Sequence, residues 1–253
     1  MYQPLSYIHP GAKIAKNVVI EPFTSIDKNV VIGEGSWIGS NVTIMSGARI
    51  GKNVSIFPGS VISAVPQDLK FKGEKNSLEI GENNLIREYV TINPGTEGGG
   101  SKTIIGNNCL FMISSHVAHD CEIEDDVVLS NQAALAGSVK VGKGVILGGY
   151  AIVHQYCFLG EYSFCAMGSA VNKDIPAYVK VRGNPAKPFG INSVGVKRLG
   201  YSSETIESLK SAYRTFYRKK LTTDEALLEL KSSVTISPEV SSSSSTRRGQ
   251  PGV

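Results

Sequence analysis

An aliphatic residue recurs every six positions along most of this chain, and this period limits what the chain can fold into. Ten isoleucines stand six residues apart without a miss from Ile8 to Ile62. After one break the series returns at 80–92, and after a second break it runs from Ile105 to Val171. An amphipathic helix would need a period of 3.6 residues and a half-buried strand a period of two. A six-residue period instead predicts a parallel β-helix, in which three hexads make one triangular coil.

Each hexad is expected to supply one short strand and one turn, with the aliphatic side chain inside the coil. A small residue often stands four places later, and three of the four cysteines occupy this position, namely Cys109, Cys121 and Cys157. We interpret them as core residues rather than as a redox pair or metal ligands. Because one hexad cannot bury its own apolar side, the coils must stack to be stable.

The repeat also divides the chain. A β-helix is predicted over residues 1–182, with insertions at about 65–79 and 94–103. The second insertion is Gly-rich but lacks the strand-to-helix context of a phosphate loop, so it is expected to be flexible. The register ends near Pro176, and VKVRGNPAKPFG is interpreted as a linker.

A small helical domain is predicted over residues 183–235. Ser202 or Ser203 can cap a helix whose apolar residues are spaced three, four and three apart. Thr222 and Glu225 form a capping box for a further helix. Between them lies a basic run that fits either a solvated helix face or a surface for an acidic protein: Lys210, Arg214, Arg218, Lys219 and Lys220. The Ser-rich tail, residues 236–253, is expected to be disordered.

Charge and composition exclude some functions and favour a compartment. The formal charge of +4, from 26 Lys and Arg against 22 Asp and Glu, is too mild to indicate a nucleic-acid binder. No stretch of 18 apolar residues and no signal peptide is found, so no membrane span is expected. Four cysteines without a C-x-x-C pair favour a reduced, cytoplasmic protein.

The stretch SSHVAHDCEIEDDVVL holds two of the four histidines and places His119 beside Asp120. Such a pair also occurs in ordinary turns, but a neighbouring carboxylate can fix the imidazole tautomer and stabilise the imidazolium of a general base. Positions 18 residues apart should stack on one face. We therefore expect His119, Gly137 and His154 to line one column, with the two histidines roughly 9–10 Å apart. Asp68 and Lys70 in the first insertion could bind sugar hydroxyls or phosphate.

At these residues the chain resembles the UDP-N-acetylglucosamine O-acyltransferases that begin lipid A synthesis. The similarity spans about residues 5–230. Its motifs are QDLKFKGE, IGENNLIRE, VTIN with a Gly-rich loop, HVAHDC, LAG, HQYC and GNPAKPFGIN, starting at residues 67, 80, 90, 116, 135, 154 and 183. Most hexapeptide acyltransferases lack both the QDLK loop and the helical tail, so the combination is specific.

The resemblance implies a homotrimer of left-handed β-helices with active sites between subunits. It implies transfer of an R-3-hydroxyacyl chain from the phosphopantetheine of acyl carrier protein to the 3-hydroxyl of the sugar, without a metal or other cofactor. His119 matches the general base, Asp120 its neighbour and Gly137 the oxyanion donor. Met167 matches the residue that limits acyl-chain length. Positions matching substrate contacts are Gln67, Asp68, Lys70, His116, Ser138, His154, Gln155, Asn192 and Arg198.

Four residues depart from the family pattern. Ser138 and Pro185 stand where histidines are usual, and Val194 and Leu199 replace a glutamate and an arginine of the nucleotide region. These departures bear on which nucleotide sugar is bound.

Four alternatives remain open from the residues. The related N-acyltransferase of the same pathway and an acetyl-CoA-dependent sugar acetyltransferase share the repeat, although the QDLK loop argues against both. A zinc-dependent β-helical carbonic anhydrase would need three histidines at one metal. A non-catalytic scaffold would not need His119 and Gly137 to be aligned.

Overall fold

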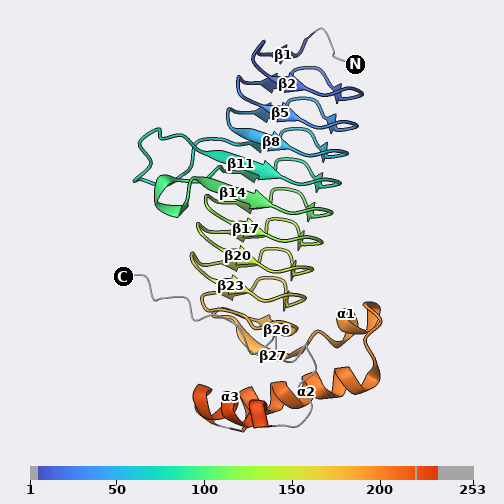
Figure 1. The fold of residues 1–253 in the computed structure, drawn as a ribbon, viewed down its shortest axis with the longest axis vertical. Coiled ribbons are helices and arrows are strands. Elements are labelled where there is room, and N and C mark those ends of the chain that lie inside the picture. The colour runs from blue at the N-terminus through green and yellow to red at the C-terminus, as the bar shows by residue number, and fades with distance from the viewer. Residues whose placement is uncertain (1–4, 220, 233–253) are drawn as a thin grey trace.

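The computed structural model describes residues 5–219 and 221–232, and these form a triangular prism of short parallel strands followed by helices (Figure 1). Every strand of the repeat pairs with a strand one coil away, so three sheets run along the prism. The hexad period is confirmed, because each of these strands ends on the repeated aliphatic residue or its substitute. With its C-terminal helices, the fold is a left-handed parallel β-helix carrying a small helical region.

The first sheet contains β1 (Tyr7–Ile8), β4 (Ser25–Ile26), β7 (Thr43–Ile44), β10 (Val61–Ile62), β13 (Thr91–Ile92), β16 (His116–Val117), β19 (Ala134–Leu135), β22 (Ile152–Val153) and β25 (Ala170–Val171). The second contains β2 (Lys13–Ile14), β5 (Val31–Ile32), β8 (Ala48–Ile50), β11 (Ser77–Ile80), β14 (Lys102–Ile105), β17 (Glu122–Ile123), β20 (Lys140–Val141) and β23 (Phe158–Leu159). The third contains β3 (Val19–Ile20), β6 (Trp37–Ile38), β9 (Ser55–Ile56), β12 (Leu85–Ile86), β15 (Leu110–Phe111), β18 (Val128–Leu129), β21 (Ile146–Leu147), β24 (Phe164–Cys165), β26 (Val179–Arg182) and β27 (Lys187–Ile191).

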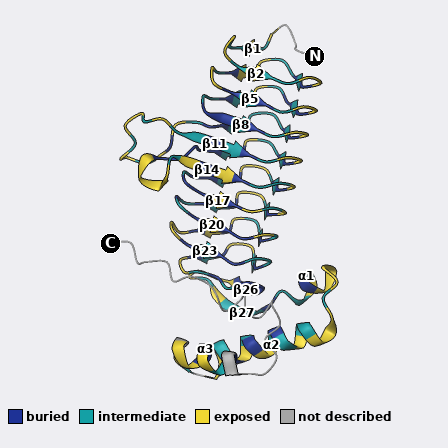
Figure 2. Ribbon diagram, in the orientation of Figure 1, coloured by how far each residue is buried: buried dark blue, intermediate teal, exposed yellow. Residues whose placement is uncertain are grey.

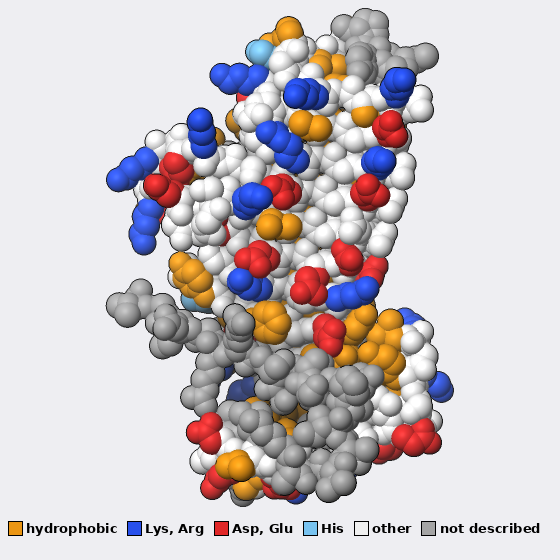
Figure 3. Space-filling view, viewed as in Figure 1, with side chains coloured by type: hydrophobic (Ala, Val, Ile, Leu, Met, Phe, Trp, Pro, Cys, Tyr) orange, Lys and Arg blue, Asp and Glu red, His pale blue; other side chains and the backbone are white. Residues whose placement is uncertain are grey.

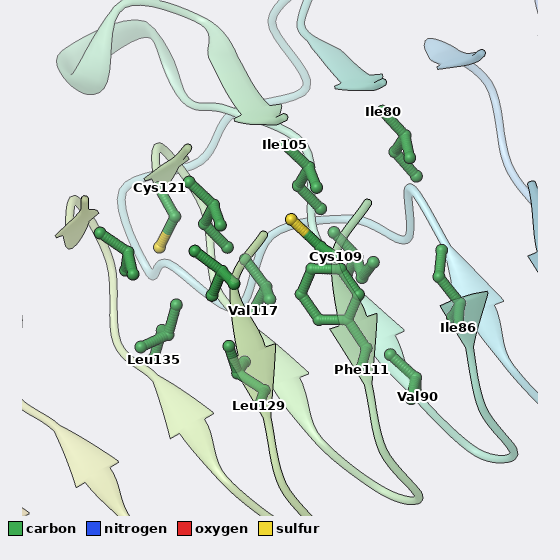
Figure 4. Packing of buried hydrophobic residues seen from close by; sticks show 14 of the residues in the cluster. Ile80, Ile86, Val90, Ile105, Cys109, Phe111, Val117, Cys121, Leu129 and Leu135 are labelled. Carbon is green, nitrogen blue, oxygen red and sulfur yellow. The ribbon is translucent and has the colours of Figure 1, made fainter. Parts of the chain in front are cut away.

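The interior of the prism is a single apolar column. Phe111, Val117 and Leu129 are fully buried and pack on side chains from neighbouring coils (Figure 4). All four cysteines are buried free thiols, as expected for core positions. Burial of this kind contributes about 25 cal/mol per Å² of apolar surface, so the stacked coils stabilise one another along the whole solenoid.

Both insertions leave the prism at the same edge, between the first and second sheets. β10 ends at Ile62 and β11 begins at Ser77, while β13 ends at Ile92 and β14 begins at Lys102. Figure 1 shows the two loops projecting side by side next to β11 and β14. We call them the first loop (63–76) and the second loop (93–101). The second loop contains a 3₁₀ turn, η1 (Glu97–Gly99).

The two loops are joined to each other. The Asn76 side-chain amide donates to the carbonyl of Gly95 at 2.8 Å, and the Glu97 N–H donates to Glu74 Oε1 at 3.2 Å. Asn93, buried at the base of the second loop, donates to the Ala64 carbonyl of the first loop at 3.0 Å. The loops are therefore supported by each other as well as by the coils beneath.

The segment interpreted as a linker is part of the third sheet. β26 extends it in parallel beside β24, and β27 then turns back and pairs antiparallel to β26. Phe189 in β27 lies under the cationic groups of Lys180 and Arg182, each 4.9 Å from the ring centre. The linker interpretation was wrong because β27 lies outside the hexad register, where its proline and glycine resemble a loop.

Three helices follow: α1 (Ser193–Arg198), α2 (Ser203–Arg218) and α3 (Thr223–Ser232). The Ser202 hydroxyl caps α2 by accepting the Thr205 N–H at 3.2 Å. The capping box is confirmed, since Thr222 N–H donates to Glu225 Oε2 at 2.7 Å and Glu225 N–H donates back to Thr222 Oγ1 at 3.3 Å. The expected tail, 236–253, and Lys220 lie outside the described residues.

The outward face of the second sheet carries charges of both signs (Figure 3). Lys102 pairs with Glu79 at 2.7 Å, and Lys140 pairs with Glu122 at 2.9 Å, each across neighbouring strands. Burial separates the inside of the prism from its surface. Buried residues point inward along each strand, and exposed residues lie in the loops and on the outer faces of the helices (Figure 2). Within residues 5–219 and 221–232, no helix is long and apolar enough to cross a membrane.

Candidate active site

His119 and Asp120 lie in the turn between β16 and β17, at the edge of the prism from which both loops leave. The second loop occupies this edge one coil earlier and the first loop two coils earlier. Gly137 and Ser138 follow one coil later, between β19 and β20. The repeat and the two insertions therefore place the His119–Asp120 turn, the Gly137–Ser138 turn and both loops along a single edge of the prism.

His119 and Asp120 form a directed pair. His119 Nδ1 lies 2.7 Å from Asp120 Oδ2. The Asp120 side chain is 2% exposed, whereas that of His119 is 21% exposed. A carboxylate at Nδ1 holds the imidazole in the tautomer whose Nε2 carries the lone pair. The reactive nitrogen is thereby directed away from the buried carboxylate.

The second loop encloses the Asp120 carboxylate. The Thr96 N–H donates to Oδ1 at 2.7 Å, and the Thr96 hydroxyl donates to Oδ2 at 2.6 Å. The Asp120 N–H in turn donates to Thr103 Oγ1 at 2.9 Å. Gly99 lies so close that a Cβ there would be 2.0 Å from the carboxylate carbon. This insertion therefore has a defined fold around Asp120, while its expected flexibility stays a prediction.

Gly137 lies directly against His119. A Cβ built on Gly137 would be 2.5 Å from His119 Cε1 and 2.6 Å from Nε2, so no larger residue fits without displacement. The Ser138 N–H donates to the His119 carbonyl at 2.9 Å and fixes this stacking. Among the residues described, none accepts a hydrogen bond from the Gly137 N–H. A backbone donor and a basic nitrogen thus share one small region.

The expected column needs one correction. Val117, Leu135 and Val153 are in register, so the residue stacked two coils beyond His119 is Gln155. His154 is in register with Ala118 and Ala136 instead, and its side chain is exposed. The error arose from treating a whole hexad as one position, although each residue of a turn points in its own direction.

His116 contacts a residue that the sequence did not single out. Its Nδ1 lies 2.7 Å from the hydroxyl of Thr91, its register partner in β13. Burial lowers the pKa of His116, and the neighbouring His119 lowers it further, while the contact with Thr91 opposes the shift. His116 therefore favours its neutral form, which can both donate and accept hydrogen bonds.

A groove of about 510 Å³ runs along the first sheet beside these residues. His116 and His154 line it together with Ile152, Asn172, Asn184 and Pro185. A second groove of about 760 Å³ lies towards the helical region and is lined by Met167, Arg182, Lys187, Phe189 and Arg218, among others. Met167 is 76% exposed, so its side chain is free to meet a bound chain.

Within the described residues, no hydrogen bond or ion pair joins the remaining site candidates to His119. Gln67, Asp68 and Lys70 are on the first loop, where Asp68 Oδ1 accepts the Lys70 N–H at 2.9 Å. Asn192 caps α1, accepting from Gly195 N–H at 3.1 Å and donating to the Tyr162 carbonyl at 3.0 Å. Arg198 is exposed at the end of α1.

Thr91, Thr96 and Asn172 are the site residues that sequence reasoning missed. Threonine is common in outward strand positions, so Thr91 carries no local signal of its own. It faces His116 one coil later, but the inserted loop lengthens that coil beyond 18 residues. Thr96 lies in a loop outside the repeat, so no period predicts its neighbours. The glycines that follow it were the only available hint of close backbone approach.

Two family models match the chain. The bacterial transferase hexapeptide model matches residues 29–64 and 102–137, and the second domain of the UDP-N-acetylglucosamine O-acyltransferases matches residues 174–249. Curated relatives named acyl-(acyl-carrier-protein)–UDP-N-acetylglucosamine O-acyltransferase include one from Pseudomonas paraeruginosa, 50% identical, and one from Stutzerimonas stutzeri, 45% identical. Each alignment covers 95% of this chain and 93% of the relative.

Solved structures agree with this assignment. A UDP-N-acetylglucosamine acyltransferase from Bacteroides fragilis superposes with a TM-score of 0.96 at 45% identity, covering 98% of this chain and 99% of the other. The corresponding enzyme from Acinetobacter baumannii gives a TM-score of 0.94 at 39% identity, with 98% of each chain covered. The similarity thus extends over nearly the full length, and the chain belongs to the UDP-N-acetylglucosamine O-acyltransferase family.

Proposed function

We propose that this chain transfers an R-3-hydroxyacyl group from acyl carrier protein to the 3-hydroxyl of UDP-N-acetylglucosamine, the first step of lipid A synthesis. The observation that carries the proposal is the His119–Asp120 pair resting on the backbone of Gly137. The relatives that share 45–50% identity over 95% of the chain are named for this reaction.

In the proposed mechanism His119 Nε2 removes the proton from the sugar 3-hydroxyl as its oxygen attacks the thioester carbonyl. Asp120 stabilises the imidazolium, and the Gly137 N–H donates to the oxyanion that forms. Collapse of this intermediate breaks the carbon–sulfur bond, and the imidazolium returns its proton to the departing thiolate. The products are the O-acylated sugar and the phosphopantetheine thiol of the carrier, with no metal or other cofactor required.

We infer that the active site lies between subunits of a homotrimer. His116 and His154 line one groove, whereas Gln67, Asp68 and Lys70 lie on the first loop. In this arrangement a neighbouring copy brings the first loop of one chain over the groove of another. Ser138 and Gln155 flank Gly137 on the same edge, and Asn192 and Arg198 are assigned to the nucleotide end.

The acyl donor is assigned to the groove beside the helical region. Acyl carrier protein is acidic, and Arg182, Lys187 and Arg218 line this groove with Met167. Within the basic run, Lys210 pairs with Glu207 and Lys219 with Glu229, whereas Arg218 lines the groove. We place the protein in the cytoplasm, where the free, buried thiols would stay reduced.

The alternatives differ in donor or in metal. The N-acyltransferase would use an amine acceptor and the acetyltransferase would use acetyl-CoA. The carbonic anhydrase alternative needs three histidines at one zinc, whereas His154 stands two coils beyond His116 and His119 in the same chain. A scaffold would have no use for the close contact of His119 with Gly137.

The test is a transfer assay with purified protein. UDP-N-acetylglucosamine is offered with R-3-hydroxyacyl carrier protein or with acetyl-CoA, and only the former should support turnover. His119→Ala should lower kcat by roughly 10²–10⁴-fold, the usual loss for a general base. His9→Ala is the matched control, because His9 lies in the first coil. Near-full activity of His119→Ala with the oligomer intact would overturn the assignment.

A further inference from the structure

The Asp120 carboxylate is bound almost completely by one residue of the second loop. Oδ1 accepts the Thr96 N–H at 2.7 Å, while Oδ2 accepts both the Thr96 hydroxyl at 2.6 Å and the His119 ring at 2.7 Å. Thr96 itself is 5% exposed. Two donors from one residue hold the carboxylate in the plane and direction that His119 requires.

The backbone around this carboxylate is equally constrained. Asp120 has a φ of 60°, in the left-handed region that few residue types adopt readily. Its N–H is bound by Thr103, which is fully buried. Gly99 closes the outer side, where any side chain would collide with the carboxylate. The second loop thus encloses the Asp120 carboxylate and fixes its orientation.

We propose that Thr96 is a positioning residue for the acyl transfer: by binding both oxygens of Asp120, it fixes the carboxylate against His119 Nδ1. The inference rests on the proposed role of His119 as general base. Thr96 does not touch the reacting atoms and acts only through Asp120. The second loop, one coil before His119, therefore supports catalysis by positioning Asp120.

This arrangement predicts a specific kinetic effect. Thr96→Val keeps the shape and the backbone N–H but removes the hydroxyl, so Oδ2 becomes free to rotate away from His119. A hydrogen bond to a charged group is worth about ten- to a hundredfold in an equilibrium or rate. We expect kcat to fall by about that factor with little change in KM for the sugar, because substrate contacts are untouched.

Two variants separate positioning from simple structural support. Thr96→Ser restores the hydroxyl and should recover most of the lost kcat. Thr24→Val is the matched control, since Thr24 is also a buried threonine whose hydroxyl donates to a carbonyl, that of Gly39 at 2.8 Å, in an early coil. It should alter Tm about as much as Thr96→Val without lowering kcat.

A double-mutant cycle with Asp120→Ala completes the test. If Thr96 acts through Asp120, Thr96→Val should add almost no further loss once the carboxylate is gone. Equal losses in both backgrounds, or a Thr96→Ser variant as impaired as Thr96→Val, would overturn the inference. If Thr96→Val does not fold, Thr96→Ala and Thr96→Ser carry the same comparison.

The outcomes remain distinguishable from those of the proposed function. Activity retained in His119→Ala would remove the general base and the inference together. Activity lost in His119→Ala but retained in Thr96→Val would remove only the role of Thr96.

Discussion

The imidazole of His119 rests on the Cα of Gly137, one coil further along the solenoid, so that a Cβ on Gly137 would lie 2.6 Å from His119 Nε2. This contact follows from the 18-residue stacking of Val117 on Leu135. It places a backbone N–H next to the basic nitrogen without any side chain between them.

Gly137→Ala should therefore impair catalysis by displacing His119. We expect kcat to fall by about 10²–10³-fold, the loss typical of a damaged oxyanion site. Gly149→Ala is the control, because its added Cβ would meet only an ordinary contact of 3.4 Å with the Asn131 carbonyl. Steady-state kinetics of both variants, with circular dichroism to verify folding, test this. Equal activity of the two variants would contradict it.

The half-buried histidine His116 should make stability depend on pH. Its pKa is lowered in the folded protein, mainly by burial, whereas in the unfolded chain it stays near its usual value of about 6.5. As pH falls below that value the unfolded state binds the proton more readily, so stability contributed by neutral His116 is lost on acidification. Thermal melts between pH 8 and 5.5 should show a smaller acid loss in His116→Gln than in the wild type.

That comparison has a built-in control. His154 is exposed, so His154→Gln is the comparison variant that removes a histidine from the surface in the same melts. A wild-type curve that His116→Gln reproduces in full would show that other groups cause the acid loss.

Met167 should set the preferred length of the acyl donor. Its exposed side chain projects into the groove that we assign to the donor, so it would obstruct a long chain. Met167→Gly should shift the ratio of kcat/KM values towards longer acyl carrier thioesters, by about 10–200-fold for each discriminating contact. An unchanged preference across donors of several lengths would exclude Met167 from this role.

The four cysteines should be unreactive in the folded protein. Burial raises the pKa of Cys121 and of Cys165 to about 12, and that of Cys109 and of Cys157 to about 11. The thiolate is the reactive form, so alkylation by iodoacetamide at pH 8 should be negligible until the chain unfolds. Mass spectrometry with and without denaturant measures this. Rapid modification of Cys157 alone would indicate local opening of its coil.

The coil architecture follows from the sequence because its driving force is periodic. Ile20, Ile38 and Ile56 recur at the coil spacing and are fully buried, and every strand they end is found in the third sheet. In the parallel β-helix, a period of six brings each of these side chains into the apolar interior. The 18-residue spacing of His119 and Gly137 also predicted correctly that the two residues lie side by side.

Contacts made by residues outside the six-residue repeat could not be predicted in the same way. Thr96 meets Asp120 only because the second loop folds back over the coil, and nothing in a Gly-rich stretch fixes that path. β27 pairs in the opposite direction to the repeat, so its register had no precedent in the preceding coils. His154 was misplaced by one residue, which in a tight turn is enough to change the direction of a side chain.

The common origin of both loops at one edge has a wider consequence. Ile62 and Ile92 end their strands normally, and β11 and β14 resume in register with β8 and with each other despite the added residues. A turn at this edge can therefore lengthen while the strands on either side of it keep their pairing register. The length of the chain at this edge does not affect the packing of the core. A solenoid of this kind can therefore gain new specificity through loops at this edge while its interior stays the same.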